Sequence, residues 1–345
     1  MSLPTRGPAL SILGPLTLLA CTRLQPLQPP PEVIEPAAPV KEVELRPTIS
    51  TPPPDPLVEQ RAAAVPASAE PSIEPVIKFT GAFATPESVL YDAAADRYLV
   101  SNINGKPSEV DSNGYILELS PDGRVTNPKL IAGGVNRVKL DAPKGLAIVG
   151  SELWVTDITL VRRFDLKSAR FKGDIELPGA TFANDIVAAP DGGAYVSDSA
   201  VQFGVMGPEP AGSDQVYFID KAGKVKVFAK GAELGGPNGL AIGRGNMLLA
   251  TTIKGDEVYW LTDKGTRDLV TKVPGGQLDG LVVIDDSLIV SSWKTETVYR
   301  GPLGGAFTPL LTKVKGVADI GYDSKRKRLL VPRFTEDTVE VYELK

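Results

Sequence analysis

The chain has 345 residues, of which 42% are hydrophobic, and a formal net charge of −5. An acidic chain offers no basic surface of the kind that nucleic-acid binding usually requires, so DNA and RNA are not expected partners. The absence of histidine excludes serine–histidine triads and removes the commonest zinc ligand and general base. The single cysteine excludes an intrachain disulfide or thiolate metal cluster.

The first residues are typical of a bacterial lipoprotein signal peptide. Arg6 precedes an apolar run from Leu10 to Ala20, which is too short for a typical membrane span and ends at Cys21. This run resembles the lipobox, in which a diacylglycerol is attached to the cysteine before cleavage. We therefore predict a signal peptide over residues 1–20 and lipidation of Cys21; the alternative is an ordinary secretory peptide that is cut nearby.

Residues 21–75 are rich in proline and contain no aromatic residue. Such a segment cannot form a core, because proline interrupts both helices and sheet ladders. We predict a lipidated, disordered tether that holds the following domain away from the membrane. Several acyl chains on Cys21 would give stable attachment to the bacterial cell envelope, outside the cytoplasm. In a Gram-negative bacterium, Thr22 after the cysteine favours the outer membrane.

From Val76 onward, short apolar runs alternate with Gly, Asp, Asn and Pro, which indicates many antiparallel strands. A phrase with a polar residue that opens an apolar strand recurs six times: Pro86-Glu87-Ser88-Val89, Pro143-Lys144-Gly145-Leu146, Ala183-Asn184-Asp185-Ile186, Pro237-Asn238-Gly239-Leu240, Leu278-Asp279-Gly280-Leu281 and, more weakly, Ala318-Asp319-Ile320. Repeats of roughly 40 residues with four strands each are typical of propeller blades. We predict an all-β, six-bladed propeller of four-stranded antiparallel blades over residues 76–345; the alternative is an open sandwich or two smaller domains.

The ends of this region predict how the ring closes. The last repeat ends with an apparent third strand at Thr338–Tyr342, and no residues follow that could form a fourth. The strand Val76–Phe79 can take that place, which leaves no unpaired edge between the first and last blades. Two long inserts, at residues 102–114 and 199–214, lie between second and third strands and are expected to rim the mouth of the central channel.

The polar residue that opens each innermost strand is expected to face the channel near the same mouth. Four of the six positions carry oxygen ligands: Glu87, Asn184, Asn238 and Asp279. Two carboxylates and two amides suit a hard divalent cation such as Ca²⁺, with water or substrate completing the coordination. The structural alternative is that these groups only bond strand ends and channel waters.

These repeats resemble the SMP-30/gluconolactonase/LRE-like family, which is related in fold to paraoxonases and strictosidine synthases. The resemblance covers about residues 80–345 and rests on the four phrases in order. It implies a calcium-dependent hydrolase in which Glu87, Asn184, Asn238 and Asp279 hold the metal. It also implies that Asp279 is the general base toward water and that the substrate is a lactone or an ester.

Two positions refine the expected substrate. Lys144 places a cation in the ring, where it would oppose metal binding, bind a substrate carboxylate or extend into solvent. Sugar-lactonase relatives often carry an arginine where this chain has Phe182, so a more apolar lactone or ester is favoured. Asn102 ends a second strand and is a candidate substrate contact, although strand-end capping explains it equally well. Trp293 is expected in blade packing.

The competing function is a non-catalytic propeller that binds a protein or a glycan.

Overall fold

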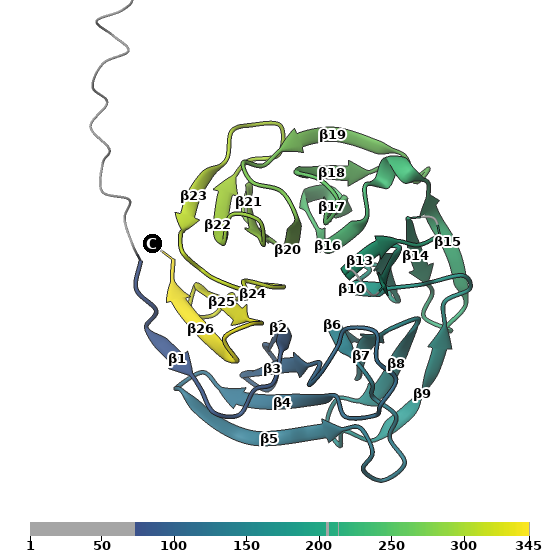
Figure 1. Ribbon diagram of the computed structural model, residues 1–345, viewed down its shortest axis with the longest axis vertical. Coiled ribbons are helices and arrows are strands. Elements are labelled where there is room, and N and C mark those ends of the chain that lie inside the picture. Colours follow the sequence, from purple (N-terminus) through teal and green to yellow (C-terminus); the bar gives the residue numbers. More distant parts are fainter. Residues whose placement is uncertain (1–72, 205–206, 213, 345) are drawn as a thin grey trace, which may run out of the picture. The chain divides into compact units, whose positions relative to one another are not determined.

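The computed structural model describes residues 73–344 except 205–206 and 213 (Figure 1). The predicted signal peptide, the lipidation site Cys21 and the predicted tether up to residue 72 lie outside the described residues. Within the described part of the chain, no helix has the length and hydropathy needed to cross a membrane.

Six four-stranded antiparallel sheets surround a central axis, as Figure 1 shows, and this confirms the predicted six-bladed propeller. From the axis outward, the first three blades contain β2 (Pro86–Asp92), β3 (Arg97–Asn102), β4 (Tyr115–Ser120) and β5 (Arg124–Ala132); β6 (Pro143–Val149), β7 (Glu152–Asp157), β8 (Leu160–Asp165) and β9 (Phe171–Glu176); and β10 (Ala183–Ala188), β11 (Ala194–Asp198), β14 (Gln215–Ile219) and β15 (Val225–Lys230). The next two contain β16 (Pro237–Ile242), β17 (Leu248–Thr252), β18 (Glu257–Leu261) and β19 (Arg267–Lys272); and β20 (Leu278–Ile284), β21 (Ser287–Ser292), β22 (Thr297–Gly301) and β23 (Thr308–Leu311). Two short 3-10 helices are present: Ala232–Leu234 lies between the third and fourth blades, and Arg244–Asn246 lies between β16 and β17 of the fourth blade.

The sixth blade is completed by the first strand of the described chain, as the sequence predicted. It consists of β24 (Gly321–Asp323), β25 (Arg328–Arg333), β26 (Thr338–Glu343) and β1 (Ile77–Phe79). In the outer pair, Ile77 lies opposite Val341 and Phe79 lies opposite Val339. The ring therefore closes by hydrogen bonds between segments from opposite ends of the domain.

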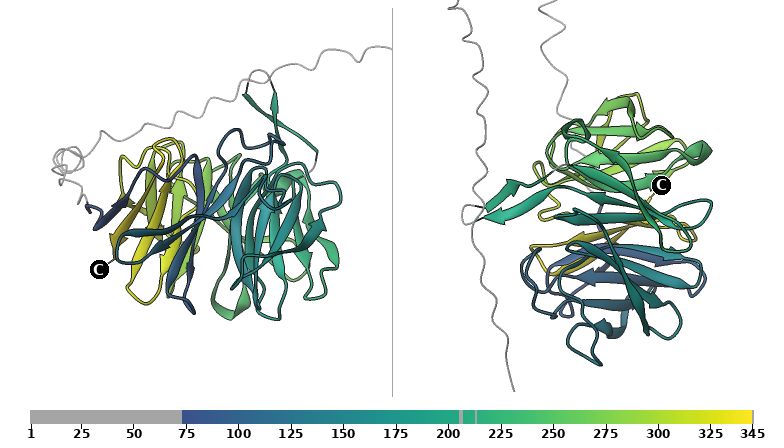
Figure 2. Two further views of the ribbon diagram at one scale, coloured as in Figure 1. Left: turned by 90° about the horizontal axis from the view of Figure 1, so that it is seen from below. Right: turned by 90° about the vertical axis from the view of Figure 1, so that its right-hand side faces the viewer.

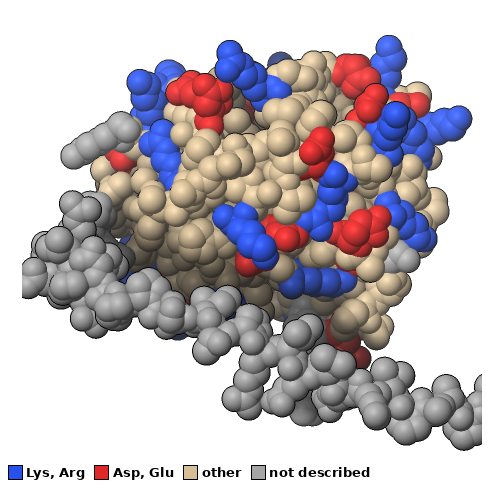
Figure 3. All heavy atoms as spheres, turned by 90° about the horizontal axis from the view of Figure 1, so that it is seen from above, with Lys and Arg blue, Asp and Glu red and all other residues tan. Residues whose placement is uncertain are grey.

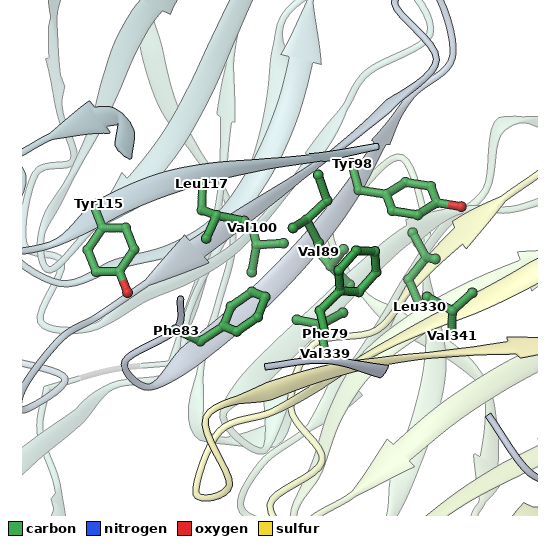
Figure 4. Packing of buried hydrophobic residues seen from close by; sticks show 11 residues of the cluster. Phe79, Phe83, Val89, Tyr98, Val100, Tyr115, Leu117, Leu330, Val339 and Val341 are labelled. Carbon is green, nitrogen blue, oxygen red and sulfur yellow. The ribbon is translucent and has the colours of Figure 1, made fainter. Parts of the chain in front are cut away.

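The blades pack face to face, and this explains why their middle strands are apolar on both sides. Consecutive side chains of a strand point to opposite faces. In β3, Tyr98 and Val100 belong to the cluster between the first and sixth blades, together with Phe79 and Leu330 (Figure 4), whereas Leu99 packs toward the second blade. Burial of these faces is the main favourable term for closing the disc.

Both predicted inserts lie between second and third strands. The first connects β3 to β4, and the second connects β11 to β14. The second insert contains a hairpin that the repeat analysis did not predict, formed by β12 (Val201–Gly204) and β13 (Gly207–Pro210). Figure 2 shows this hairpin projecting from one face of the disc.

Candidate functional site

A β-bulge recurs at the start of the innermost strands and determines where the polar residues of the repeated phrase point. In the first five blades, the pairing register between the first and second strands shifts across this phrase, as between Pro86 and Val89. The residues inside the shift have no regular cross-strand partner, and a bulge of this kind redirects side chains. The local structure thus turns Glu87, Lys144, Asn184, Asn238 and Asp279 out of the sheets and toward the axis.

Glycine follows the polar residue in three of these bulges because the neighbouring blade lies too close for a side chain. A Cβ atom at Gly239 would lie 2.2 Å from the Asp279 carbonyl oxygen, and one at Gly280 would lie 2.2 Å from the Ile320 nitrogen. Real Cβ atoms do not approach backbone this closely. The glycines therefore allow the innermost strands to converge and bring the polar side chains of neighbouring blades together.

Hydroxyl groups on the second strands hold these polar residues by their backbone. A serine or threonine near the end of one blade's second strand donates a hydrogen bond to a backbone carbonyl in the repeated phrase of the next blade. Where that carbonyl belongs to the ring position itself, the pairs are Thr156 to Asn184, Thr251 to Asp279 and Ser291 to Ala318. This network was not predicted, although the sequence carries a signal for it: each donor directly precedes the residue that ends the strand.

Asn102 belongs to a second set of contacts that fix the loop before each innermost strand. Its Oδ1 accepts a hydrogen bond from the Ala84 amide at 3.1 Å, and its Nδ2 donates to the Val100 carbonyl at 3.1 Å. The side chain is fully buried and does not line the cavity described next. These contacts favour strand-end capping over the tentative role in substrate binding. Asp157 caps the Ala142 amide in the same way in the second blade.

The five polar residues of the first five blades line one cavity of about 390 Å³ at the mouth of the channel. Pro107 of the first insert and Val201 of the hairpin also line it, so the inserts rim this mouth as predicted. Most of the remaining wall is apolar, and the other lining residues are Ile103, Phe182, Ser199, Ile253, Gln277, Trp293 and Phe334. The sixth position of the ring, Ala318, contributes nothing to the lining.

Asp279 is held by two donors inside this cavity. Its Oδ1 accepts a hydrogen bond from Asn238 Nδ2 at 2.8 Å, and its Oδ2 accepts one from Trp293 Nε1 at 2.5 Å. Burial raises the pKa of Asp279 to about 6, while these two hydrogen bonds act in the opposite direction. Trp293 was expected only in blade packing. Its contact with Asp279 joins the loop after β21 to the start of β20, and the repeat pattern does not indicate it.

Two oxygen atoms of the ring are buried without a hydrogen-bond partner among the described residues. They are Glu87 Oε2 and Asn238 Oδ1. Burial raises the pKa of Glu87 well above its ordinary value, and the charge of Asp279 raises it further, whereas Lys144 lowers it. A buried acceptor without a donor costs free energy, so a ligand that supplies positive charge would stabilise these two oxygen atoms.

Lys144 lies inside the cavity wall, so of the three alternatives given for it the one in which it extends into solvent is wrong. The residue is 1% exposed, and its Nζ donates a hydrogen bond to the Ala142 carbonyl at 3.0 Å. The same nitrogen lies 4.4 Å from the centre of the Phe182 ring, which is a cation–π distance. Burial lowers the pKa of Lys144 to about 8, against the opposing effects of Asp157 and Glu87.

The oxygen donors of the ring fit a hard divalent cation such as Ca²⁺. Glu87 and Asp279 offer carboxylates, Asn184 and Asn238 offer amides, and two of their oxygens have no other partner. The described residues contain no group of three or more His, Cys, Asp or Glu side chains that is arranged to hold a metal. A cation here therefore depends on the two amide oxygens as much as on the two carboxylates.

A second pair of carboxylates lies one residue further along the innermost strands, at a separate cavity of about 170 Å³. Asp185 accepts hydrogen bonds from the Ile186 and Leu240 amides, both at 2.6 Å. Asp319 accepts a hydrogen bond from the Ser88 hydroxyl. Burial raises the pKa of Asp185 to about 7 and that of Asp319 well above its ordinary value. Asp185 thus accepts backbone amides and Asp319 a side-chain hydroxyl, and neither lines the larger cavity of about 390 Å³.

Comparison with known proteins supports the fold. No family model and no curated protein matches the sequence. Among solved structures, a gluconolactonase from Xanthomonas campestris is 21% identical with a TM-score of 0.59, over 78% of this chain and 89% of that chain. A virginiamycin B lyase from Staphylococcus aureus is 14% identical with a TM-score of 0.53, over 77% and 98%. A chain of a nidogen/laminin complex is 18% identical with a TM-score of 0.50, over 63% and 76%. The predicted resemblance is confirmed at the level of fold: this chain shares the architecture of gluconolactonase propellers.

Proposed function

We propose that the protein is a metal-dependent hydrolase of the bacterial cell envelope that acts on an apolar lactone or ester. The observation that carries this proposal is the set of four oxygen donors, Glu87, Asn184, Asn238 and Asp279, that converge in one cavity with two oxygen atoms unpaired. The structural likeness to a gluconolactonase supports the same chemistry, although one fold can host several activities.

The residues of the cavity have distinct roles in this proposal. Glu87 anchors the cation, and the amide oxygens of Asn184 and Asn238 complete the protein's share of its coordination. A bound divalent cation would polarise the acyl carbonyl and stabilise the negative charge that develops on its oxygen. The apolar wall, which includes Phe182, receives the organic part of the substrate.

Asp279 is the proposed general base as well as a ligand. The indole of Trp293 and the amide of Asn238 fix its carboxylate, and its raised pKa of about 6 makes it a stronger base than an ordinary aspartate. Asp279 accepts a proton from water as the water oxygen bonds to the acyl carbon. The bond from that carbon to the leaving oxygen then breaks, and the proton passes to the leaving oxygen.

The location is proposed from the sequence of the first 75 residues. Cleavage before Cys21 and acylation of this residue would attach the propeller to the envelope, in the outer membrane of a Gram-negative cell. Labelled palmitate fed to expressing cells should be incorporated into the wild type and not into Cys21→Ser. Equal labelling of both chains would contradict the lipid anchor.

Thermal unfolding during a Ca²⁺ titration of the full chain tests the metal site. A site that exists only in the folded state should add about 2.7 kcal/mol when Ca²⁺ reaches a hundred times its dissociation constant. Asp279→Ala should lose this gain, whereas Asp286→Ala, at an exposed carboxylate, should keep it. No shift of the wild type with Ca²⁺, Mg²⁺, Mn²⁺ or Zn²⁺ would overturn the proposal.

Turnover is measured on a panel of aliphatic lactones and aryl esters, and the expected result is hydrolysis that depends on the added cation. Cation binding without turnover of any member would instead indicate a non-catalytic propeller with a bound ion, which binds a protein or a glycan.

A further inference from the structure

Lys144 differs from the lysines on the outer surface in forming no direct ion pair, although the charges of Asp157 and Glu87 act on it through space. On the face shown in Figure 3, basic side chains lie among acidic ones, and exposed lysines such as Lys272 and Lys315 form ion pairs. Lys144 is 1% exposed and lines the cavity. In the part of the chain that the structure describes, it forms no ion pair, and its one hydrogen bond goes to the neutral Ala142 carbonyl.

An ammonium group has three N–H donors, so two donors of Lys144 remain after the bond to Ala142. A buried cation with unused donors is costly unless an acceptor reaches it. The Phe182 ring covers one side of the nitrogen at 4.4 Å, which stabilises the charge without supplying a hydrogen-bond acceptor. A ligand in the cavity can therefore supply the acceptor for the two unused N–H donors of Lys144.

The charge balance of the cavity indicates that this acceptor is an anion. Glu87 and Asp279 contribute two negative charges to the lining and Lys144 contributes one positive charge. With the divalent cation of the proposed function, this balance becomes positive by one unit. One negative charge on the ligand neutralises the site, whereas without the cation the same anion would be repelled.

The apolar residues of the cavity wall indicate the chemical character of the rest of the ligand. Ile103, Val201, Ile253, Trp293 and Phe334 present apolar surface around the same cavity of about 390 Å³. A small cavity of this kind suits a short chain or a ring and gains affinity for each carbon that leaves water. Charged groups and apolar surface thus line the same cavity.

We propose that the cavity binds monocarboxylates with an apolar chain or ring, and that Lys144 is the residue that selects their negative charge. This inference rests on the proposed function for the cation at the ring. It also names the substrate class: lactones and esters whose hydrolysis releases such an acid, with the product carboxylate held by Lys144 beside the cation.

Isothermal titration calorimetry with hexanoate and hexanamide tests the proposal on the full chain with Ca²⁺ present. The two probes have similar shape and differ in charge. Hexanoate should bind at least about tenfold more tightly than hexanamide, in keeping with a charge-assisted hydrogen bond. From acetate to hexanoate, each added methylene group should tighten binding about fourfold. Equal affinity for hexanoate and hexanamide, or no binding of either, would overturn the proposal without the use of any variant.

Two lysine variants test whether Lys144 causes the preference for hexanoate over hexanamide. Lys144→Met should weaken hexanoate at least about tenfold and change hexanamide by less than about threefold. Lys294→Met removes an exposed lysine next to Trp293 and should leave both affinities unchanged. Unaltered hexanoate binding by a folded Lys144→Met protein, or an equal loss in Lys294→Met, would contradict the role of Lys144.

The outcomes separate this inference from the proposed function. A Ca²⁺ shift and hydrolysis of neutral esters, with no preference for hexanoate over hexanamide, would overturn the inference and leave the hydrolase proposal standing. Hexanoate binding that requires Ca²⁺ and Lys144, without turnover of any lactone or ester, would retain the carboxylate site and overturn the hydrolase proposal.

Discussion

Two acidic levels lie along the central channel and differ in how their oxygen atoms are satisfied. In the upper level, Glu87 Oε2 and Asn238 Oδ1 are buried without partners, and the side chains line the larger cavity. In the lower level, Asp185 accepts two backbone N–H groups and Asp319 accepts the Ser88 hydroxyl. Both levels contain buried carboxylates with raised pKa values: Glu87 in the upper level, and Asp185 and Asp319 in the lower.

The difference shows that acidic residues in a channel do not by themselves define a ligand site. The lower carboxylates already have donors within the fold, so a cation there would have to compete with existing hydrogen bonds. The upper oxygens have no such competition, and their unpaired state favours ligand binding at this level. Changes at the two levels should therefore affect different properties of the protein.

The largest effect is expected at the proposed base. Asp279→Asn keeps the size of the side chain and removes its ability to accept a proton, so the rate of cation-dependent ester hydrolysis should fall at least about 100-fold. Initial rates on the best ester of the panel measure this. The control is Asp286→Asn, the same change at an exposed position, which should keep the wild-type rate. A rate within threefold of wild type for Asp279→Asn would remove Asp279 from the mechanism.

The two levels are compared directly by one neutralising change in each. Glu87→Gln removes a carboxylate with an unpaired oxygen and should reduce the stabilisation by Ca²⁺ from about 2.7 kcal/mol, at a hundred times the dissociation constant, to near zero. Asp319→Asn removes a carboxylate that Ser88 already satisfies and should change this stabilisation by less than about 0.5 kcal/mol. Thermal unfolding with and without Ca²⁺ measures both, and equal losses would break the distinction between the levels.

The convergence of the upper-level residues on one cavity could be predicted because its signal is local. Each polar residue opens an innermost strand in a repeated phrase, and the bulge that redirects it lies within that phrase, as between Pro143 and Leu146. Repetition also predicted the closing strand at residues 76–79, since the last repeat lacks a fourth strand of its own. These features follow from spacing along the chain, which a sequence shows.

Other features depend on contacts between distant loops, and the sequence could not show them. Whether Lys144 reaches solvent or folds back on Phe182 depends on the depth of the cavity wall, so the sequence left its alternatives open. The indole of Trp293 reaches Asp279 only because the loop after β21 lies beside the start of β20. The hairpin β12–β13 lies in an insert between β11 and β14, so the repeat pattern does not indicate it.

A smaller effect is expected at Trp293, which positions Asp279 without meeting the reacting atoms. Trp293→Phe keeps an aromatic ring and removes the N–H that Asp279 accepts, so kcat should fall about tenfold. KM and the thermal midpoint should change little, because the apolar contact with Phe334 remains. Trp260→Phe, in the outer part of the fourth blade, is the matched control and should leave kcat unchanged. A rise in KM with constant kcat would assign Trp293 to substrate binding instead.

The smallest effect is expected in the hydroxyl network that holds the upper level from behind. Thr251→Val removes the donor to the Asp279 carbonyl and should lower the free energy of unfolding by about 1–2 kcal/mol, since a buried carbonyl loses its partner. Ser291→Ala removes the equivalent donor to Ala318, where the ring carries no ligand, and should cost a similar amount in denaturant unfolding. Only Thr251→Val should also weaken Ca²⁺ binding, by about twofold to tenfold, because it alone releases the backbone of a proposed ligand. If both variants weaken Ca²⁺ binding equally, the network stabilises the disc as a whole and does not tune the site.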